Sequence, residues 1–291
     1  LSYLPWTHCF GLVMDLMIAI DRELRLVRLA PKTMDPDALR SRFDDYSVDH
    51  FNTVPRVVRD LAECGFTDWG RFREGVVGGA TIDESVASVL SGTNLRVGYG
   101  QTEASPGITL GNPGDFEPGI IGQPVGCTLS LADDGELIFE GKNAHRATFH
   151  PEEERIERFP VPRTVPTGDL AEHDTGTYYF RGRKDHRFKL PNGRFLDPLH
   201  VESTLERALD EVETIGIVPV RNGFDLGLVG AGQVDCGRLR KHIADSFAGL
   251  EQYFEDLHQL SSDEVPMTGK GEIDREALQK ILSSRTSTAV D

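Results

Sequence analysis

The first hundred residues alternate between two patterns of apolar and polar positions. Apolar residues at helical spacing predict helices, and short apolar runs bounded by Gly or Pro predict strands. The predicted helices lie at 12–20, from Pro36, from Pro55 to Gly65 and at 83–90, and the predicted strands at 24–29, 50–54, 75–80 and 95–100. Asp35 before Pro36 is a favourable helix start, since the cap is followed by a proline in the first turn. Such alternation favours a mostly parallel sheet covered by helices.

A second pattern begins after about Gly111. Residues 113–183 are rich in Gly and Pro, and their apolar positions alternate over short runs such as TLSLADDGELIFEG. Asp134-Gly135 and Thr175-Gly176 are turn signals between such runs. This part of the chain is therefore predicted to be a small antiparallel β region.

A third pattern begins at Pro198. It predicts helices at 198–209, 236–247 and 274–283 and strands at 214–220 and 225–232. These elements form an α+β unit of roughly 100 residues, which is a usual size for a small domain. The final SSRTSTAVD is expected to be a frayed tail. The fold class expected for the whole chain is α/β, with a large first part and a small α+β second part.

The charge of the chain limits its partners. It carries 47 acidic and 31 basic residues, a formal net charge of -16. A surface this acidic argues against a nucleic acid or an anionic membrane as partner.

The spacing of the cysteines and the apolar run at residues 10–20 indicate in which cellular compartment the protein is expected. The four cysteines, Cys9, Cys64, Cys127 and Cys236, are widely spaced, which argues against a disulfide framework and fits a reducing cytoplasm. The run at 10–20 contains Asp15 and is too short for a transmembrane segment. The chain starts inside an apolar stretch, LSYLPW, and we expect this to be the middle of a fold.

The segment VGYGQTE, residues 97–103, carries the strongest chemical signal. An aromatic ring beside glycines can lie flat against a purine base. A hydroxyl and a carboxylate next to it can meet a phosphate and its Mg²⁺. The alternative is a simple turn with a core tyrosine.

Two further segments carry groups that suit a nucleotide. TGD, residues 167–169, offers a carboxylate for ribose hydroxyls, and FRGRKD, residues 180–185, offers arginines for ribose or phosphate oxygens. The alternative for both is a hairpin turn with exposed charges.

A lysine and a histidine complete the set of candidates. Lys270 is flanked by glycines in PMTGKGEIDREAL, so it can move and reach an anion, although a solvated lysine before a helix has the same pattern. His8 lies in LPWTHCFG, where a satisfied core histidine is the alternative.

The motifs LPWTHCFG, GGA, GYGQTE, GELIFEG, TGD, GRKD, FKLPNGRFLDP and TGKG occur in this order. In order and spacing they resemble the adenylate-forming superfamily of acyl-CoA synthetases, peptide-synthetase adenylation domains and luciferases. The resemblance runs from Leu1 to about Leu278 and looks closest to the long-chain acyl-CoA synthetase branch. It implies a partial large adenylation domain at 1–184 and a C-terminal lid domain at 185–291.

The resemblance also implies a role for each matching residue. Tyr99 would stack on adenine beside Gly100 and Gln101, with Gly78, Gly79 and Ala80 as the other wall; Asp169 and Arg183 would hold the ribose; Thr102 would contact the α-phosphate and Glu103 Mg²⁺; His8 would lie at the acyl carboxylate; Asp185 would be the hinge; and Lys270 would be the catalytic lid lysine.

The implied reaction has two steps. A carboxylic acid, fatty or aryl, reacts with ATP to give acyl-AMP and pyrophosphate, and a thiol then takes the acyl group. The thiol would be coenzyme A or the phosphopantetheine arm of a carrier protein. The alternative is a degenerate relative that binds nucleotide or acyl-adenylate without catalysis, or one part of a split enzyme with a complementary N-terminal polypeptide.

The sequence departs from the family pattern at three places. The Ser/Thr/Gly-rich phosphate loop expected before LPWTHCFG is not in the chain. The step from Lys270 to Arg275 is two residues longer than the family pattern, so either Lys270 or Glu272 occupies the lid-lysine position. In GKNAHRATFHPEEE the family more often has a Gly-Tyr pair, and His145 and His150 are expected to be surface residues there.

Overall fold

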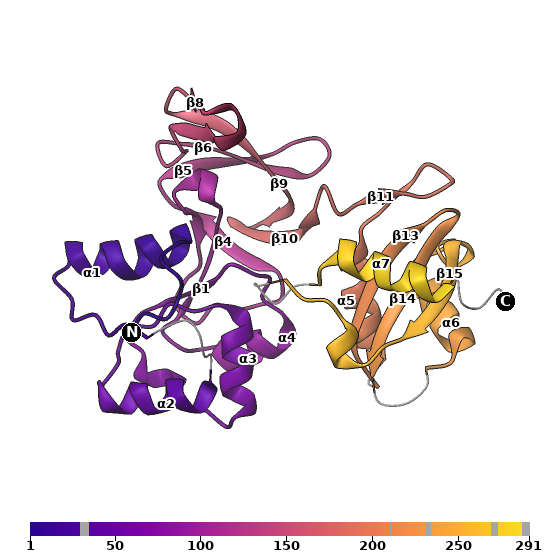
Figure 1. Ribbon diagram of the computed structural model, residues 1–291, viewed down its shortest axis with the longest axis horizontal. Helices are drawn as coiled ribbons and strands as arrows, with labels where there is room; N and C mark the ends of the chain where they lie inside the picture. Colours follow the sequence, from indigo (N-terminus) through magenta and orange to yellow (C-terminus); the bar gives the residue numbers. More distant parts are fainter. Residues whose placement is uncertain (30–34, 210, 231–233, 269–272, 287–291) are drawn as a thin grey trace. The chain divides into compact units, whose positions relative to one another are not determined.

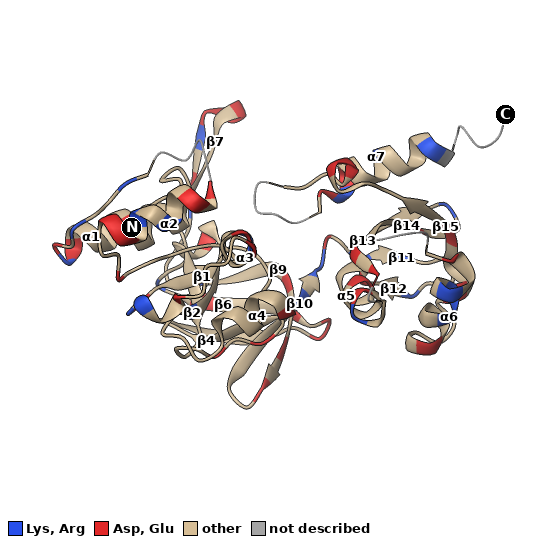
Figure 2. Ribbon diagram, turned by 90° about the horizontal axis from the view of Figure 1, so that it is seen from below, with Lys and Arg blue, Asp and Glu red and all other residues tan. Residues whose placement is uncertain are grey.

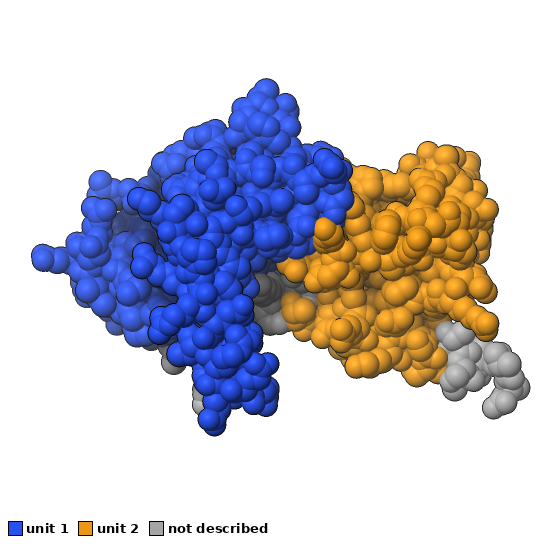
Figure 3. Space-filling view, turned by 90° about the horizontal axis from the view of Figure 1, so that it is seen from above, with its two compact units in different colours: residues 1–180 blue, residues 181–291 orange. Residues whose placement is uncertain are grey.

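A computed structural model describes residues 1–29, 35–209, 211–230, 234–268 and 273–286. The chain forms two compact units, residues 1–180 and residues 181–291 (Figure 3).

Unit 1 begins with helices. They are a π-helix, Gly11–Met17, that continues into α1 (Ile18–Asp21), then α2 (Pro36–Asp45), α3 (Pro55–Glu63) and α4 (Glu84–Leu90), with short 3-10 turns at Trp69–Arg71, Thr102–Ala104 and Pro151–Glu153. Asp35 caps α2 by accepting a hydrogen bond from the Asp37 amide, as its position before a first-turn proline predicts.

One mixed sheet of eight strands dominates unit 1 (Figure 1). In spatial order its strands are β1 (Val76–Gly78), β2 (Arg96–Gly100), β3 (Gly107–Leu110), β4 (Ile120–Pro124), β10 (Thr177–Arg183), β9 (Arg163–Asp174), β6 (Glu136–Gly141) and β5 (Cys127–Leu131). β1 and β2 pair in parallel, and β3 pairs antiparallel with both β2 and β4. A separate hairpin joins β7 (Ala147–His150) to β8 (Arg155–Arg158).

The α/β class expected from the sequence is confirmed: β1 and β2 pair in parallel, as expected for the first hundred residues, and β5, β6 and β9 pair antiparallel, as expected for residues 113–183. The segments at 24–29 and 50–54 are not full strands. They make only isolated parallel bridges, Ser2 to Arg28, His50 to Glu74 and Thr53 to Val77. A segment with high β propensity forms a full strand only where a neighbouring strand can pair with it through a continuous series of backbone hydrogen bonds.

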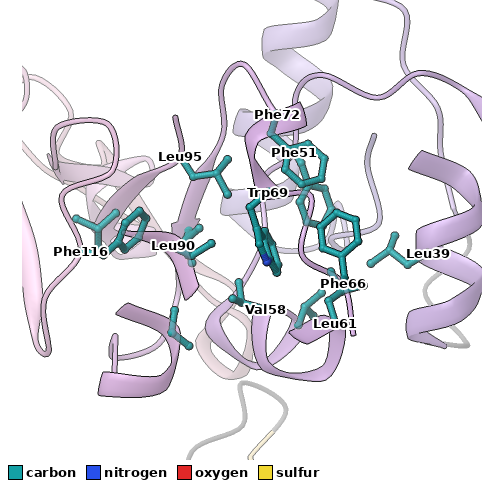
Figure 4. Close-up of a cluster of buried hydrophobic side chains, with 14 of the residues drawn as sticks. Leu39, Phe51, Val58, Leu61, Phe66, Trp69, Phe72, Leu90, Leu95 and Phe116 are labelled. Carbon is teal, nitrogen blue, oxygen red and sulfur yellow. The ribbon is translucent and has the colours of Figure 1, made fainter. Parts of the chain in front are cut away.

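Aromatic side chains fill the core beneath the helices of unit 1 (Figure 4). Phe43 and Phe51 pack edge to face with ring centroids 5.0 Å apart, and Phe51 stacks on Phe72 at 5.1 Å. Phe43 comes from α2, and Val58 of α3 and Val77 of β1 belong to the same cluster, which therefore packs both helices against the sheet.

Unit 2 is a small α+β unit. Its elements are β11 (Phe188–Lys189), β12 (Phe195–Leu196), α5 (Pro198–Ala208), β13 (Val212–Val220), β14 (Gly223–Gly230), α6 (Cys236–Ser246), β15 (Phe254–Gln259) and α7 (Arg275–Thr286), with 3-10 turns at Glu251–Tyr253 and Ser262–Glu264. β13 and β14 pair antiparallel, and β15 adds in parallel beside β14.

Acidic residues lie on elements of both units, among them α2 and α5 (Figure 2).

In the described part of the chain, no helix has the combination of length and apolar character needed to cross a bilayer.

Candidate active site

The predicted nucleotide residues of unit 1 lie at the end of β2 and on β9. Tyr99 belongs to β2 and Asp169 to β9, and the Tyr99 hydroxyl donates a hydrogen bond of 2.6 Å to Oδ2 of Asp169. Four strand-to-strand steps separate β2 from β9. At about 4.8 Å a step, a flat sheet would hold them roughly 19 Å apart. The sheet is therefore strongly curled, and the curl brings these two residues together.

Asp169 is held in a buried position. Only 7% of its surface is exposed, and its backbone amide donates to the Thr167 hydroxyl oxygen at 3.1 Å. That hydroxyl in turn donates to the Leu137 carbonyl at 2.7 Å. The Thr and Asp of TGD therefore form one local unit on β9 that fixes the carboxylate near the Tyr99 hydroxyl.

Glycines allow β1, β2 and the following loop to approach closely. A Cβ on Gly78 would lie 2.2 Å from the Gly98 carbonyl oxygen, and one on Gly100 would lie 1.8 Å from the Pro106 carbonyl oxygen. Gly79 has a φ of 87°, a left-handed value that favours glycine. Ala80 follows Gly79 in the turn after β1. The predicted wall at 78–80 thus lies at the end of β1, the parallel neighbour of the strand that carries Tyr99.

The loop after β2 carries three more predicted residues. Thr102 and Glu103 are exposed, in a single 3-10 turn, and the amide nitrogen Nε2 of Gln101 is buried without an acceptor among the described residues. A buried donor of this kind is costly unless something accepts from it. An oxygen or ring nitrogen of a ligand would meet that need.

The segment with His8 lies beside this loop. The Cys9 thiol is 3.5 Å from the Thr102 hydroxyl. His8 itself is exposed at the start of the first helix, where its carbonyl accepts from the Leu12 amide at 3.0 Å. The structure therefore brings the neighbour of His8 to Thr102.

Two residues near the site were missed by the sequence analysis. The Glu103 carbonyl accepts from the His145 amide at 2.7 Å and lies 3.1 Å from Nδ1 of the His145 ring. The side-chain amide of Asn143 donates to the Gly107 carbonyl at 2.7 Å. His145 was expected to be a surface residue, and it is half-buried instead. The only sequence signal was the departure from the family's Gly-Tyr pair at this place.

Arg183 and Asp185 belong to unit 2 and pair with each other. The Arg183 guanidinium donates to both Asp185 oxygens, at 2.9 and 3.2 Å. These bonds outweigh the opposing effect of burial and hold the pKa of the Asp185 carboxyl below its usual value. The predicted ribose arginine and the predicted hinge residue are thus one ion pair.

The two candidates for the lid lysine position, Lys270 and Glu272, lie outside the described residues. The residues on both sides are described. Met267 and Ile273 form a β-bridge, and Arg275 begins α7 with its guanidinium on Glu202. Among the residues that the structure describes, no three His, Cys, Asp or Glu side chains gather into a metal site.

Comparison with solved structures concerns the fold. The fold matches O-succinylbenzoate coenzyme A synthetase from Bacillus subtilis in complex with AMP, with a TM-score of 0.77 and 20% identity over 95% of this chain and 60% of that one. Another structure of that synthetase contains ATP and magnesium ion. The fold is therefore that of adenylate-forming ligases.

Sequence relatives give the family. Residues 1–143 match the AMP-binding enzyme family, as the motifs predict. D-alanine--D-alanyl carrier protein ligase from Staphylococcus aureus is 26% identical over 202 residues, 64% of this chain and 41% of that protein. Long-chain-fatty-acid--CoA ligase 6 from Rattus norvegicus is 30% identical over 219 residues, 69% of this chain and 31% of that protein. The chain thus spans less than half the length of these relatives.

Proposed function

We propose that the chain is part of an AMP-forming acid–thiol ligase that activates a carboxylic acid as an acyl-adenylate. The observation that carries this proposal is the bond between Tyr99 and Asp169, which places an aromatic ring and a buried carboxylate together beside Thr102 and Glu103. The match of residues 1–143 to the AMP-binding enzyme family supports it independently.

In this proposal the Tyr99 ring lies against adenine and the Asp169 carboxylate accepts the ribose hydroxyls. A carboxylate that accepts two hydroxyls fixes both the position and the rotation of the sugar. Thr102 and the Gln101 amide then face the phosphate side of the nucleotide. Positioning of this kind is the main contribution of a protein to adenylate formation.

The residues of the loop fit a magnesium ion. Glu103 offers exposed carboxylate oxygens, which are the donors that Mg²⁺ takes, usually together with phosphate oxygens and water. Magnesium, when bound, would neutralise charge on the phosphates. His8 is assigned to the acyl carboxylate, because Cys9 beside it contacts Thr102.

The lid lysine, the hinge and one ribose contact are assigned to unit 2. Lys270 is proposed to stabilise the charge that develops as the carboxylate attacks the α-phosphate, with Glu272 as the other occupant of that position. Coenzyme A or a phosphopantetheine arm is the proposed acceptor, and Arg183 and Asp185 the proposed ribose contact and hinge. A cytoplasmic location belongs to the same proposal, and cell fractionation tests it.

Calorimetry with AMP and with an acyl-sulfamoyl adenosine analogue tests the nucleotide site, with the protein in its full natural length. Replacing Asp169 by Ala removes charged hydrogen bonds worth about 1.5–3 kcal/mol, so the affinity should fall roughly 10- to 100-fold. Asp174→Ala is the matched control, because Asp174 ends the same strand with an exposed side chain. Equal affinity in both variants would overturn the assignment.

Pyrophosphate exchange with a panel of fatty, aryl and amino acids tests catalysis. Exchange with one class of acid, lost in Lys270→Ala, supports the ligase. Tight binding of the analogue without exchange for any acid would instead indicate a non-catalytic nucleotide-binding relative.

A further inference from the structure

The loop between β6 and β7 contacts the start of β3 at one end and the Thr102–Ser105 turn at the other. At one end Asn143 donates to the Gly107 carbonyl, and at the other His145 donates to the Glu103 carbonyl through its backbone amide. Between these contacts, Ala144 and Ala104 are both buried in one hydrophobic cluster. The loop that carries the predicted metal ligand is therefore held against a neighbouring loop of the same unit.

The His145 ring is itself fixed on three sides. Nδ1 lies 3.1 Å from the Glu103 carbonyl oxygen, Nε2 lies 3.1 Å from the Thr148 hydroxyl, and Phe159 packs edge to face on the ring at 5.2 Å. A carbonyl oxygen only accepts, so Nδ1 carries the proton and donates to Glu103. In the neutral form of the ring, Nε2 then accepts from the Thr148 hydroxyl. The hydrogen bonds thus select one tautomer and one orientation.

The turn itself gives Glu103 few restraints. Its backbone bonds join Ala104 to Gln101 and Ser105 to Thr102, so neither uses the Glu103 carbonyl. Ser105 ends the turn with a φ of 58°, in the left-handed region. A residue other than glycine keeps this conformation only where contacts with the surrounding structure hold it there. The Glu103 carboxylate is exposed. Its position is therefore set largely by the two donors of His145 on its own backbone.

We propose that His145 is a positioning residue for the magnesium ligand Glu103. It fixes the backbone from which the carboxylate projects, so that the oxygens meet the metal without reorganisation. Groups behind a metal ligand commonly control its affinity in this way. The inference rests on the proposed function, since it names the role of Glu103 at that site.

The test measures binding of ATP at increasing concentrations of Mg²⁺, because Mg²⁺ is held together with phosphate oxygens. His145→Ala should raise the half-saturating Mg²⁺ concentration about 10-fold, the lower range for loss of a group behind a metal ligand. Binding without Mg²⁺ should stay within about twofold, because the adenine and ribose contacts are untouched. A merely structural role would change both together.

Two further variants separate the hydrogen bond from folding. His145→Asn keeps a donor near the place of Nδ1 and should restore most of the Mg²⁺ response, whereas His145→Gln should not. His150→Ala is the matched control, because His150 lies in β7 and its ring Nε2 is 3.2 Å from the Glu157 carboxylate. If His145→Ala does not fold, the Asn and Gln pair still decides the question.

The outcomes separate this inference from the proposed function. Mg²⁺-dependent binding in the unchanged protein, with an equal response in His145→Gln and His145→Asn, overturns the role of His145 alone. Absence of any Mg²⁺-dependent binding in the unchanged protein overturns both the metal role of Glu103 and the inference built on it.

Discussion

The two units hold their predicted catalytic segments in different ways. In unit 1, the loop after β2 is fixed by hydrogen bonds of neutral groups, from Asn143 and His145, and by close approach of backbone at Gly100. In unit 2, Arg275 follows the segment that contains Lys270. Its guanidinium donates to both carboxylate oxygens of the buried Glu202.

The two kinds of contact differ in how much stability is lost when one of them is removed. A neutral hydrogen bond contributes about 1 kcal/mol, and several of them share the restraint in unit 1. A buried ion pair concentrates the restraint, because loss of one partner leaves an unpaired charge in the interior. We therefore expect unit 1 to lose function before stability, and unit 2 to lose stability first.

The largest expected effect is on the ion pair of unit 2. Arg275→Ala should lower the free energy of unfolding of unit 2 by about 3–5 kcal/mol, because Glu202 would stay buried without a cation and would keep only the hydrogen bond from the Ile217 amide. Chemical denaturation measures this. Arg238→Ala, which breaks a more exposed pair with Glu211, is the control and should cost less than about 1 kcal/mol. Equal losses would remove the contrast between the units.

The next effect is on the backbone approach of unit 1. Gly100→Ala should destabilise the protein by about 1–3 kcal/mol, because the new Cβ meets the Pro106 carbonyl and the loop must move. Thermal unfolding with calorimetry measures the change. At Gly70 an added Cβ has nothing within 4 Å, so Gly70→Ala serves as the control. A neutral Gly100→Ala variant would show that the loop yields easily.

A smaller effect is expected for the hydroxyl of Tyr99. Tyr99→Phe keeps the ring and removes the bond to Asp169, so stability should fall by about 1 kcal/mol. Analogue binding should persist, because stacking needs only the ring. Denaturation and calorimetry on the same variant measure both quantities. Loss of binding with unchanged stability would assign the hydroxyl to the ligand instead of to the fold.

The smallest effect depends on pH and concerns a buried carboxyl of unit 2. Asp225 lies 3.4 Å from His258 and accepts from the Asp256 amide, and burial raises the pKa of Asp225. The folded state therefore favours the neutral carboxyl. That contribution to stability is present below the usual Asp pKa and is lost as pH rises through the raised value.

Asp225→Asn stays neutral at every pH. Its stability relative to the unchanged protein should increase as pH rises from the usual Asp pKa, about 3.9, and level off above the raised pKa. Denaturation curves between acid and neutral pH measure the difference. Asp256→Asn, with an exposed side chain, is the control. A difference that decreases with pH would contradict the assigned direction.

Local chemistry made much of the fold predictable. Helices begin at Pro36 and Pro55, and hairpin turns lie at Asp134-Gly135 and Thr175-Gly176, as expected. These features depend on residues adjacent in the chain, where caps, prolines and glycines restrict the backbone directly. The strand β15 and the hairpin β7–β8 were not expected, because their sequences lack strong alternation.

The sequence also determined which residue types stand at the candidate site, through the order of motifs that the family match later supported. Tertiary structure decided what those residues touch. The curl of the sheet brings Tyr99 to Asp169, 70 positions apart in the chain. Folding of the β6–β7 loop brings His145 to Glu103, 42 positions away. Neither contact has a local signature, because each depends on strand order and loop packing, which short-range propensities do not encode.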